Sequence, residues 1–318
     1  MSRKRTNVLN LPKPVRFELA PDGTPRKVMS RIRHGIIAPP GFLIFAADKA
    51  QIEARMVATL AGQDDLVEAF RQGRDVYAEH AEDQFSRPCS KKLAETDPIA
   101  KKDRDSSKAV ILGAGFGLGP EKHQRQVRKD GLNLTFSEAH ANITGYRSKY
   151  YKIPELWGTY EQAMWDLLIR RKSTEVGPVT FEWIDQNDKV AGIRRPNGLH
   201  LIYPRIRMER DKQTDRPQLL CNQARDKWPR KLYGGAITEN VVQSLARDLI
   251  VQDMISLQKE LGLRTGLQVY DEIVGIVPED KAEELGPKII AIMSRSPKWL
   301  PNLPVAVEIG FAKNYGDA

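Results

Sequence analysis

The 318-residue chain has few of the residues that disulfide frameworks and zinc sites need. It contains two cysteines, Cys89 and Cys221, which lie far apart and lack metal-ligand spacing. A disulfide framework or a zinc site is therefore not expected, and a reducing compartment is the default. The five histidines do not cluster and form no His-x-x-x-His pair. Zinc hydrolase chemistry has no support.

Long apolar runs and several catalytic motifs are also missing. No apolar stretch approaches the about 20 residues that a membrane-spanning helix needs. The basic start, Met1–Arg5, lacks the apolar segment of a secretory signal. No serine lies in a Gly-x-Ser-x-Gly elbow. The glycine-rich run at 113–119 fits neither a dinucleotide-binding fingerprint nor a P-loop. We therefore expect a soluble cytoplasmic protein with no membrane partner.

The charge balance points to a polyanionic partner. The hydrophobic fraction of 41% is ordinary for a globular chain, and the formal net charge is +9. A basic surface that serves only solubility is the alternative explanation.

Hydrophobic patterning predicts a mixed α+β chain, with extended or irregular chain over residues 1–40 and a loop over 86–98. Strands are expected at 42–48, 266–277 and 305–309, with β-hairpins over 176–222. Helices are expected at 50–62, after Asp64, at 75–85, 99–115, 120–130, 137–151, 154–172, 236–261 and 280–294.

Asp48 and Asp271 each lie at the end of an apolar strand-like run. A single aspartate there is usually a cap or turn residue. Two of them on separate strands have the donors that Mg²⁺ prefers, with Glu272 as an auxiliary carboxylate and Glu53 close by in the first turn of a helix. Two metal ions about 3.5–4 Å apart suit phosphoryl transfer.

The basic helix between these strands has a suitable face for a nucleotide. Arg104, Lys108, Leu112 and Phe116 recur every four residues and drift slowly around the helix. The cations suit phosphates, and the apolar half suits base and sugar. An amphipathic surface helix with extended cations is the alternative.

Three stretches, in order, resemble the family A DNA polymerases, the bacterial DNA polymerase I type, and most of all their phage branch. Residues 48–55, Asp-Lys-Ala-Gln-Ile-Glu-Ala-Arg, resemble motif A, Asp-Tyr-Ser-Gln-Ile-Glu-x-Arg. Residues 104–117 are similar to motif B, Arg-x-x-x-Lys-x-x-x-Phe/Tyr-Gly-x-x-Tyr-Gly, and residues 269–272 to motif C, Val-His-Asp-Glu. Weaker matches at 7–12, 73–77, 197–204 and 238–248 extend the resemblance over nearly the whole chain.

The resemblance implies a right-hand polymerase that copies primer-template DNA with dNTPs, in a bacterial or phage-infected cell. The implied fold is a palm of antiparallel sheet and helices with a mainly helical fingers insertion. We expect the first part of the palm at 1–74, the fingers at 75–225 and the second part of the palm at 226–318.

The resemblance also implies residue roles. Asp48 and Asp271 would hold two Mg²⁺ ions, for which Mn²⁺ is an alternative. Glu53 would reject the ribose 2′-hydroxyl, while Arg104 and Lys108 would grip the triphosphate. Lys108 is also a candidate proton donor to the departing pyrophosphate.

Further positions complete the expected site. Glu272 joins the catalytic group, Gln51, Leu112 and Phe116 the nucleotide-binding group, and Arg55, Gln243 and Tyr270 the DNA-binding group. Phe116 would lie near the template–primer junction, Gln243 on the minor-groove side and Tyr270 at the primer end.

Three of these residues depart from the family pattern. Leu112 replaces Phe or Tyr, which puts sugar selectivity in question. Phe116 replaces a tyrosine whose hydroxyl normally bonds the gate glutamate, so Glu53 needs another partner or a water. Tyr270 replaces a histidine. No metal ligand is lost, so we expect catalysis to be retained.

The resemblance begins where the family's thumb has just ended, which predicts a fold without thumb or exonuclease domains. We hypothesise one half of a split polymerase, with a separate polypeptide supplying the thumb, with or without a 3′–5′ exonuclease. Competing hypotheses are a single-subunit RNA polymerase, a non-catalytic DNA-binding or assembly subunit derived from a polymerase, and an orphan gene fragment that folds poorly. Glu53 argues against the first, and the intact aspartates and cations argue against the second.

Overall fold

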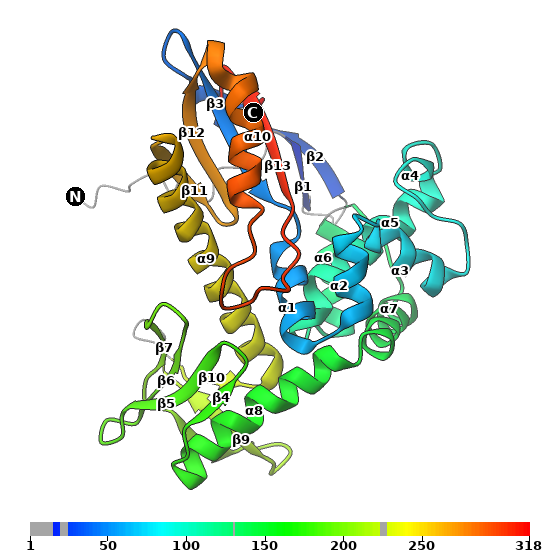
Figure 1. The fold of residues 1–318 in the computed structure, drawn as a ribbon. Helices are drawn as coiled ribbons and strands as arrows, with labels where there is room; N and C mark the ends of the chain where they lie inside the picture. Colours follow the sequence, from blue (N-terminus) through cyan, green and yellow to red (C-terminus); the bar gives the residue numbers. More distant parts are fainter. Residues whose placement is uncertain (1–14, 20–24, 130, 223–227) are drawn as a thin grey trace, which may run out of the picture.

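A four-stranded antiparallel sheet forms one end of the molecule (Figure 1). The computed structural model describes residues 15–19, 25–129, 131–222 and 228–318. The sheet order is β11-β12-β3-β13. Its strands are β3 (Phe42–Lys49), β11 (Thr265–Val269), β12 (Glu272–Pro278) and β13 (Val307–Ala312). Segments that are more than 200 residues apart in the chain are therefore adjacent here.

Helices cover one face of this sheet. Side chains alternate along β3, and Phe45 and Ala47 pack into an apolar cluster with residues of α9 (Gly234–Leu261) and α10 (Ala282–Met293). Ile44 and Ala46 belong to a separate cluster with Val274 on β12 and the C-terminal segment. The strand is thus buried on both faces, which explains its continuous apolar run.

A group of helices lies beside the sheet, on the right in Figure 1. They are α1 (Ile52–Ala61), α2 (Asp64–Arg71), α3 (Val76–Phe85), α4 (Leu93–Thr96), α5 (Pro98–Gly113), α6 (Pro120–Lys129) and α7 (Phe136–Lys149). Helix α8 (Lys152–Arg170) runs from this group along the lower part of the molecule. The long helices match the expected ones closely. The expected loop at 86–98 contains α4, whose first N–H is accepted by the Ser90 hydroxyl at 3.0 Å, so the loop prediction was wrong there.

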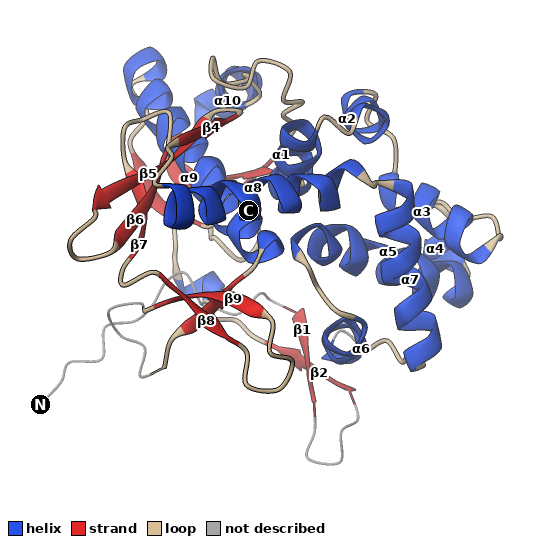
Figure 2. Ribbon diagram, turned by 90° about the horizontal axis from the view of Figure 1, so that it is seen from below, coloured by secondary structure: helices blue, strands red, loops and turns tan. Residues whose placement is uncertain are grey.

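Small sheets follow α8 and lie on the left in Figure 2. One has the order β4-β5-β6-β7 and another the order β10-β9-β8. Their strands are β4 (Thr174–Val176), β5 (Val179–Asp185), β6 (Val190–Arg194), β7 (His200–Tyr203), β8 (Arg207–Arg210), β9 (Pro217–Cys221) and β10 (Arg230–Leu232). The expected hairpins are present. They contact α8 and α9, and the three expected domain boundaries stay predictions.

The N-terminal region corrects one expectation. An antiparallel hairpin joins β1 (Val15–Leu19) and β2 (Pro25–Met29) where irregular chain was predicted. The alternation Val-Arg-Phe-Glu-Leu in β1 has the period of a strand. The surrounding proline and basic residues obscured that pattern.

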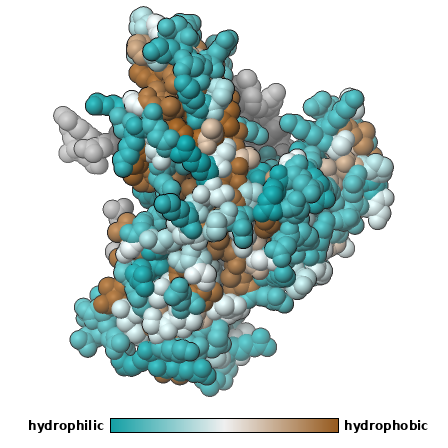
Figure 3. All heavy atoms as spheres, viewed as in Figure 1, coloured by the Kyte–Doolittle hydropathy of each residue, from teal (hydrophilic) through white to brown (hydrophobic). Residues whose placement is uncertain are grey.

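The surface divides by polarity in Figure 3, where the helices on the right are mostly hydrophilic. Apolar side chains gather near the upper sheet, around a groove of about 440 Å³ lined by α10 and β13 residues including Ile290, Ile309 and Phe311. No helix in the described part of the chain is long and apolar enough to cross a membrane.

Candidate active site

The end of β3 brings two predicted aspartates to one edge of the sheet. The antiparallel register sets Asp48 opposite Glu272 on β12. A two-residue turn, Tyr270-Asp271, joins β11 to β12, with Tyr270 at φ +56°. The Lys49 N–H donates to the Asp271 carbonyl at 3.2 Å, which ties the turn to the end of β3. Asp48 and Asp271 therefore belong to the same edge.

The donor chemistry of this edge suits a hard divalent cation. Glu272 Oε1 is buried close to the Tyr315 hydroxyl, and neither atom makes a hydrogen bond of full geometry among the residues that the structure describes. Burial, and then the Glu272 carboxylate, raise the pKa of the nearby Tyr315 hydroxyl. Within the same residues, no group of three or more His, Cys, Asp or Glu side chains forms a ready-made metal cluster. Carboxylate oxygens with other positions left to phosphate and water fit Mg²⁺.

Glu53 lies next to this edge, in the first turn of α1. Burial raises the pKa of its carboxyl, and the charges of Asp271 and Glu239 raise it further. The Gln243 side chain on α9 lies near Glu53 and lowers the pKa of its carboxyl in turn. We propose that Gln243 is the partner of Glu53 in place of the hydroxyl that Phe116 lacks. Gln243 is itself exposed, so it also presents a polar surface beside Glu53.

The turn after β3 is held from inside by Arg55. Gln51 adopts a left-handed conformation with φ +55° just before α1. Arg55 is 5% exposed and donates to the Ala50 carbonyl at 2.8 Å, to the Phe70 carbonyl at 3.2 Å and to Gln51 Oε1 at 3.3 Å. This burial leaves little guanidinium surface for DNA, so we propose that Arg55 shapes the motif A turn instead.

Helix α5 places two predicted cations over one ring. Arg104 donates two hydrogen bonds to Asp75, at 2.8 and 3.3 Å. The Tyr77 ring centroid lies 5.5 Å from the Arg104 guanidinium and 5.9 Å from the Lys108 ammonium. Burial raises the pKa of Tyr77 to about 12, although its hydrogen bond with Gln51 lowers it. Lys108 is exposed and has no ion-pair partner within the described ranges, so it is available for an anion.

Leu112 and Phe116, the apolar half of the predicted nucleotide-binding face, lie in different environments in the structure. Leu112 is 38% exposed, but Phe116 is 7% exposed and belongs to the main core. Helix α5 ends at Gly113, and the 3₁₀ turn Ala114–Phe116 carries Phe116 inward. Direct contact between Phe116 and a nucleotide does not fit this burial. We propose that Phe116 anchors the end of α5.

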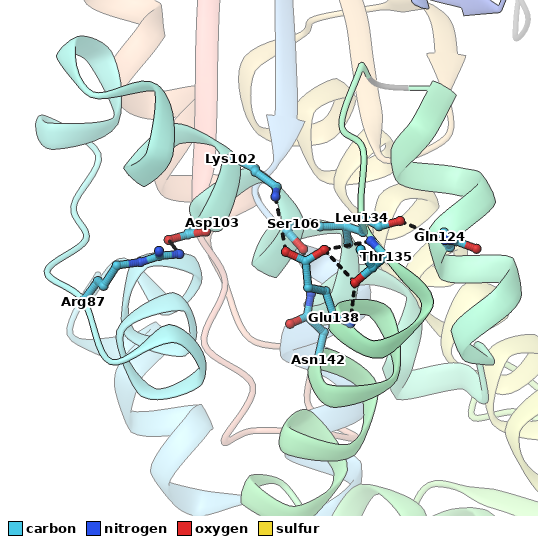
Figure 4. Close-up of polar contacts among 9 residues, drawn as sticks. All are labelled: Arg87, Lys102, Asp103, Ser106, Gln124, Leu134, Thr135, Glu138 and Asn142. Atoms are coloured by element: carbon cyan, nitrogen blue, oxygen red, sulfur yellow. Dashed lines mark hydrogen bonds and ion pairs between the residues drawn. The ribbon is translucent and has the colours of Figure 1, made fainter. Parts of the chain in front are cut away.

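Polar contacts fix α5 to its neighbours (Figure 4). They join Arg87 to Asp103 at 2.6 Å, Lys102 to Glu138 at 3.4 Å and Asn142 to Ser106 at 2.7 Å. Thr135 and Glu138 form a capping box at the start of α7, an arrangement that satisfies N–H groups which would otherwise lack partners. The cationic face of α5 is therefore carried on a braced set of helices.

A groove of about 1100 Å³ runs along α9 beside Gln243. Its lining includes amide and cationic side chains: Asn197, Asn240, Arg195, Arg247 and Lys259. Arg195 pairs with Asp248 at 2.5 Å, which holds the turn between β6 and β7 against α9. The groove also has an apolar lining that includes Leu199, Ile255 and Trp299. Its cationic and amide side chains, Arg247 and Lys259 among them, suit contact with a phosphate backbone.

Several residues at the site were not predicted. Asp75 and Tyr77 lie in a stretch that resembled the family weakly, but the sequence alone assigned them no role. Lys49 and Asp253 form a buried ion pair of 2.7 Å. The sequence signal for this pair was the position of Lys49 at the end of an apolar strand, because an ammonium buried there needs a counter-charge.

Comparison with known proteins decides the family. The family model described as DNA polymerase family A matches residues 1–167, more than half of the chain. The chain belongs to this family. Its fold also resembles that of the POL domain of Pol1 from M. smegmatis, solved in complex with DNA primer-template and dNTP, with a TM-score of 0.60 at 20% identity over 96% of this chain and 48% of that one. The expected palm and fingers architecture of family A is thus confirmed.

The curated relatives are longer than this family A chain. The DNA polymerase of Bacillus phage SP02 is 26% identical over 305 residues, which are 94% of this chain and 45% of the relative. The thermostable DNA polymerase I of Thermus aquaticus is 25% identical over 288 residues, which are 90% of this chain and 28% of the relative. The chain therefore spans less than half the length of these polymerases.

Proposed function

We propose that this chain is a DNA-directed DNA polymerase unit that adds dNTPs to a primer 3′ end by two-metal-ion phosphoryl transfer. The observation that carries the proposal is the placement of Asp48 and Asp271 at one sheet edge. The cationic face of α5 adds the anion-binding group that such a reaction needs. The relatives named as polymerases and the neighbour solved with primer-template and dNTP support the same activity.

Asp48 and Asp271 would hold the two Mg²⁺ ions. When bound, such ions lower the pKa of the attacking hydroxyl and neutralise charge on the phosphates. Lys108 would donate to the triphosphate and hold a proton for the departing pyrophosphate. Arg104 would exchange its Asp75 partner for a phosphate oxygen. Glu53, held by Gln243, would crowd a ribose 2′-hydroxyl.

We also propose that the groove beside Gln243 contacts the primer-template duplex. Tyr270, at the exposed tip of the β11–β12 turn, would meet the primer end. A separate thumb-bearing polypeptide stays a prediction. If this prediction holds, adding such a polypeptide raises the processivity of primer extension. Long processive synthesis by the chain alone would contradict the prediction.

The direct test is primer extension with Mg²⁺ and dNTPs at low salt. Asp271→Ala is expected to lower the rate roughly a thousandfold, equivalent to about 4 kcal/mol of transition-state stabilisation. Asp280→Ala, an exposed aspartate beyond β12, is the matched control and keeps wild-type activity. Extension that survives in Asp271→Ala would refute the assigned centre. Preference for rNTPs would favour the RNA polymerase alternative, and absence of extension with retained DNA binding would favour the non-catalytic one.

A further inference from the structure

A fully buried cation stands next to the proposed metal ligand Asp48. Lys49 ends β3 and is 0% exposed, whereas Asp48 is half-buried. Neighbouring side chains of a strand point to opposite faces of the sheet. The Lys49 side chain therefore points away from the site, toward the helices beneath the sheet.

Lys49 joins four elements of the fold. Its ammonium lies 2.7 Å from Asp253 Oδ2 on α9, and that pair is 0% and 5% exposed. The ammonium also donates to the Met293 carbonyl at the end of α10. Its main-chain N–H donates to the Asp271 carbonyl in the β11–β12 turn at 3.2 Å. The residue after one proposed metal ligand thus holds the backbone of the other.

Stability alone explains this pair poorly. A buried ammonium is costly unless it is paired, and a buried pair seldom adds net stability over apolar side chains of similar volume. Lys49 stands where the family A motif has a tyrosine. A role in fixing geometry accounts better for an ion pair at this position.

We propose that the Lys49–Asp253 pair is a positioning device that fixes α9 against the end of β3 and so holds Asp48 and Asp271 at the separation that two metal ions need. The inference rests on the proposed function. Gln243, ten residues earlier on α9, also lies close enough to Glu53 to lower the pKa of its carboxyl, about 15 Å along the helix axis from Asp253. Displacement of α9 would therefore disturb both sides of the motif A turn.

The test replaces the pair by apolar side chains. The double variant Lys49→Met with Asp253→Leu replaces both buried charges by apolar side chains of similar length and branching, so it is expected to fold. The matched control is Glu260→Gln, which weakens the exposed Arg295–Glu260 pair of 2.5 Å between α9 and the segment after α10. Thermal unfolding of every variant separates a folding defect from a positioning defect.

Three measurements follow: Mn²⁺ binding by electron paramagnetic resonance with dATP present, hydrogen exchange of segments 42–50 and 265–272, and primer extension at varied Mg²⁺. In the folded double variant we expect Mn²⁺ binding to weaken about tenfold, as for other residues that orient metal ligands. Exchange in both segments becomes faster, and kcat falls about tenfold while the KM for dNTP stays within about twofold. Glu260→Gln changes none of these.

Unchanged Mn²⁺ affinity and exchange in a folded double variant overturn the proposal. If that variant does not fold, Lys49→Met with Asp253→Asn, which keeps the shape at position 253 and leaves no buried charge without a partner, decides by the same two measurements. Failure of the polymerase proposal is recognised separately, as a wild-type chain that binds Mn²⁺ through Asp48 but extends no primer. In that case Mn²⁺ binding and hydrogen exchange of the variants still decide whether the Lys49–Asp253 pair positions Asp48 and Asp271.

Discussion

The guanidinium of Arg104 on α5 donates two hydrogen bonds to the carboxylate of Asp75, at 2.8 and 3.3 Å. The same carboxylate caps α3 by accepting the Ala78 N–H at 3.2 Å. Tyr77, two residues after Asp75, lies against Arg104 and near Gln51, which precedes α1. A triphosphate on α5 must therefore compete with Asp75 for Arg104.

Asp75→Asn is expected to lower the KM for dNTP several-fold with little change in stability. Asparagine caps a helix as well as aspartate does, but it lacks the charge that holds Arg104. Asp75→Ala also removes the cap and costs about 1 kcal/mol of unfolding free energy. Steady-state kinetics and denaturant unfolding measure the two effects. A raised KM in Asp75→Asn would mean that the pair orients Arg104 for the phosphate.

Gln243→Ala is expected to reduce discrimination against rNTPs by about tenfold, equivalent to 1.4 kcal/mol. The reason is that, in the proposed mechanism, Gln243 orients Glu53, and without it Glu53 would no longer crowd the 2′-hydroxyl. Single-nucleotide incorporation of dATP and ATP measures the ratio of kcat/KM. Gln258→Ala, exposed on the same helix, is the control. An equal loss with dATP and ATP would assign Gln243 to DNA contact alone.

Acid is expected to destabilise the helical part of the chain through two buried histidines. Burial lowers the pKa of both His80 and His123 to about 4, and the Lys149 charge adds to the effect at His80. The unfolded chain, with pKa near 6.5, binds the protons first, so stability is full above pH 6.5 and is lost as pH falls toward 4. Protonation of each histidine lowers the free energy of unfolding by on the order of 3 kcal/mol as the pH falls from 6.5 to about 4.

Urea unfolding between pH 7.5 and 4.5 checks this prediction. His123→Leu is expected to flatten the pH dependence, since neither ring nitrogen of His123 has a partner in the described part of the structure. His140→Gln, at an exposed position on α7, should leave the slope unchanged. An identical slope in wild type and His123→Leu would assign the acid sensitivity to other groups.

Gly235→Ala is expected to destabilise the chain by about 1–3 kcal/mol. A Cβ at Gly235 would lie 2.8 Å from the Phe116 carbonyl oxygen, a backbone atom that cannot rotate away. Gly158→Ala is the matched control, because a Cβ there meets nothing within 4 Å. A helical alanine should stabilise α8 by about 0.5–1 kcal/mol. Thermal unfolding compares the two, and equal stability would refute close packing at Gly235.

Particular residues show how far sequence reasoning reached. The helix 99–115 and strand 42–48 were predicted because periodicity and length suffice for long elements. The burial of Phe116 was not predicted. A four-residue spacing keeps side chains on one face only while the helix continues, and α5 ends at Gly113. Arg55 matched the motif, yet only packing reveals that its guanidinium bonds two backbone carbonyls.

The amino-acid sequence by itself determined the candidate groups of this family A chain: its acidic pair, its cationic helix, their order along the chain and the family they resemble. These depend on residue type and spacing, which are local. Only the tertiary structure decided which groups meet. Strand register sets Asp48 opposite Glu272, and burial pairs Lys49 with Asp253. Such contacts join residues more than 200 positions apart, and they form because apolar faces and buried charges must find partners that no local pattern specifies.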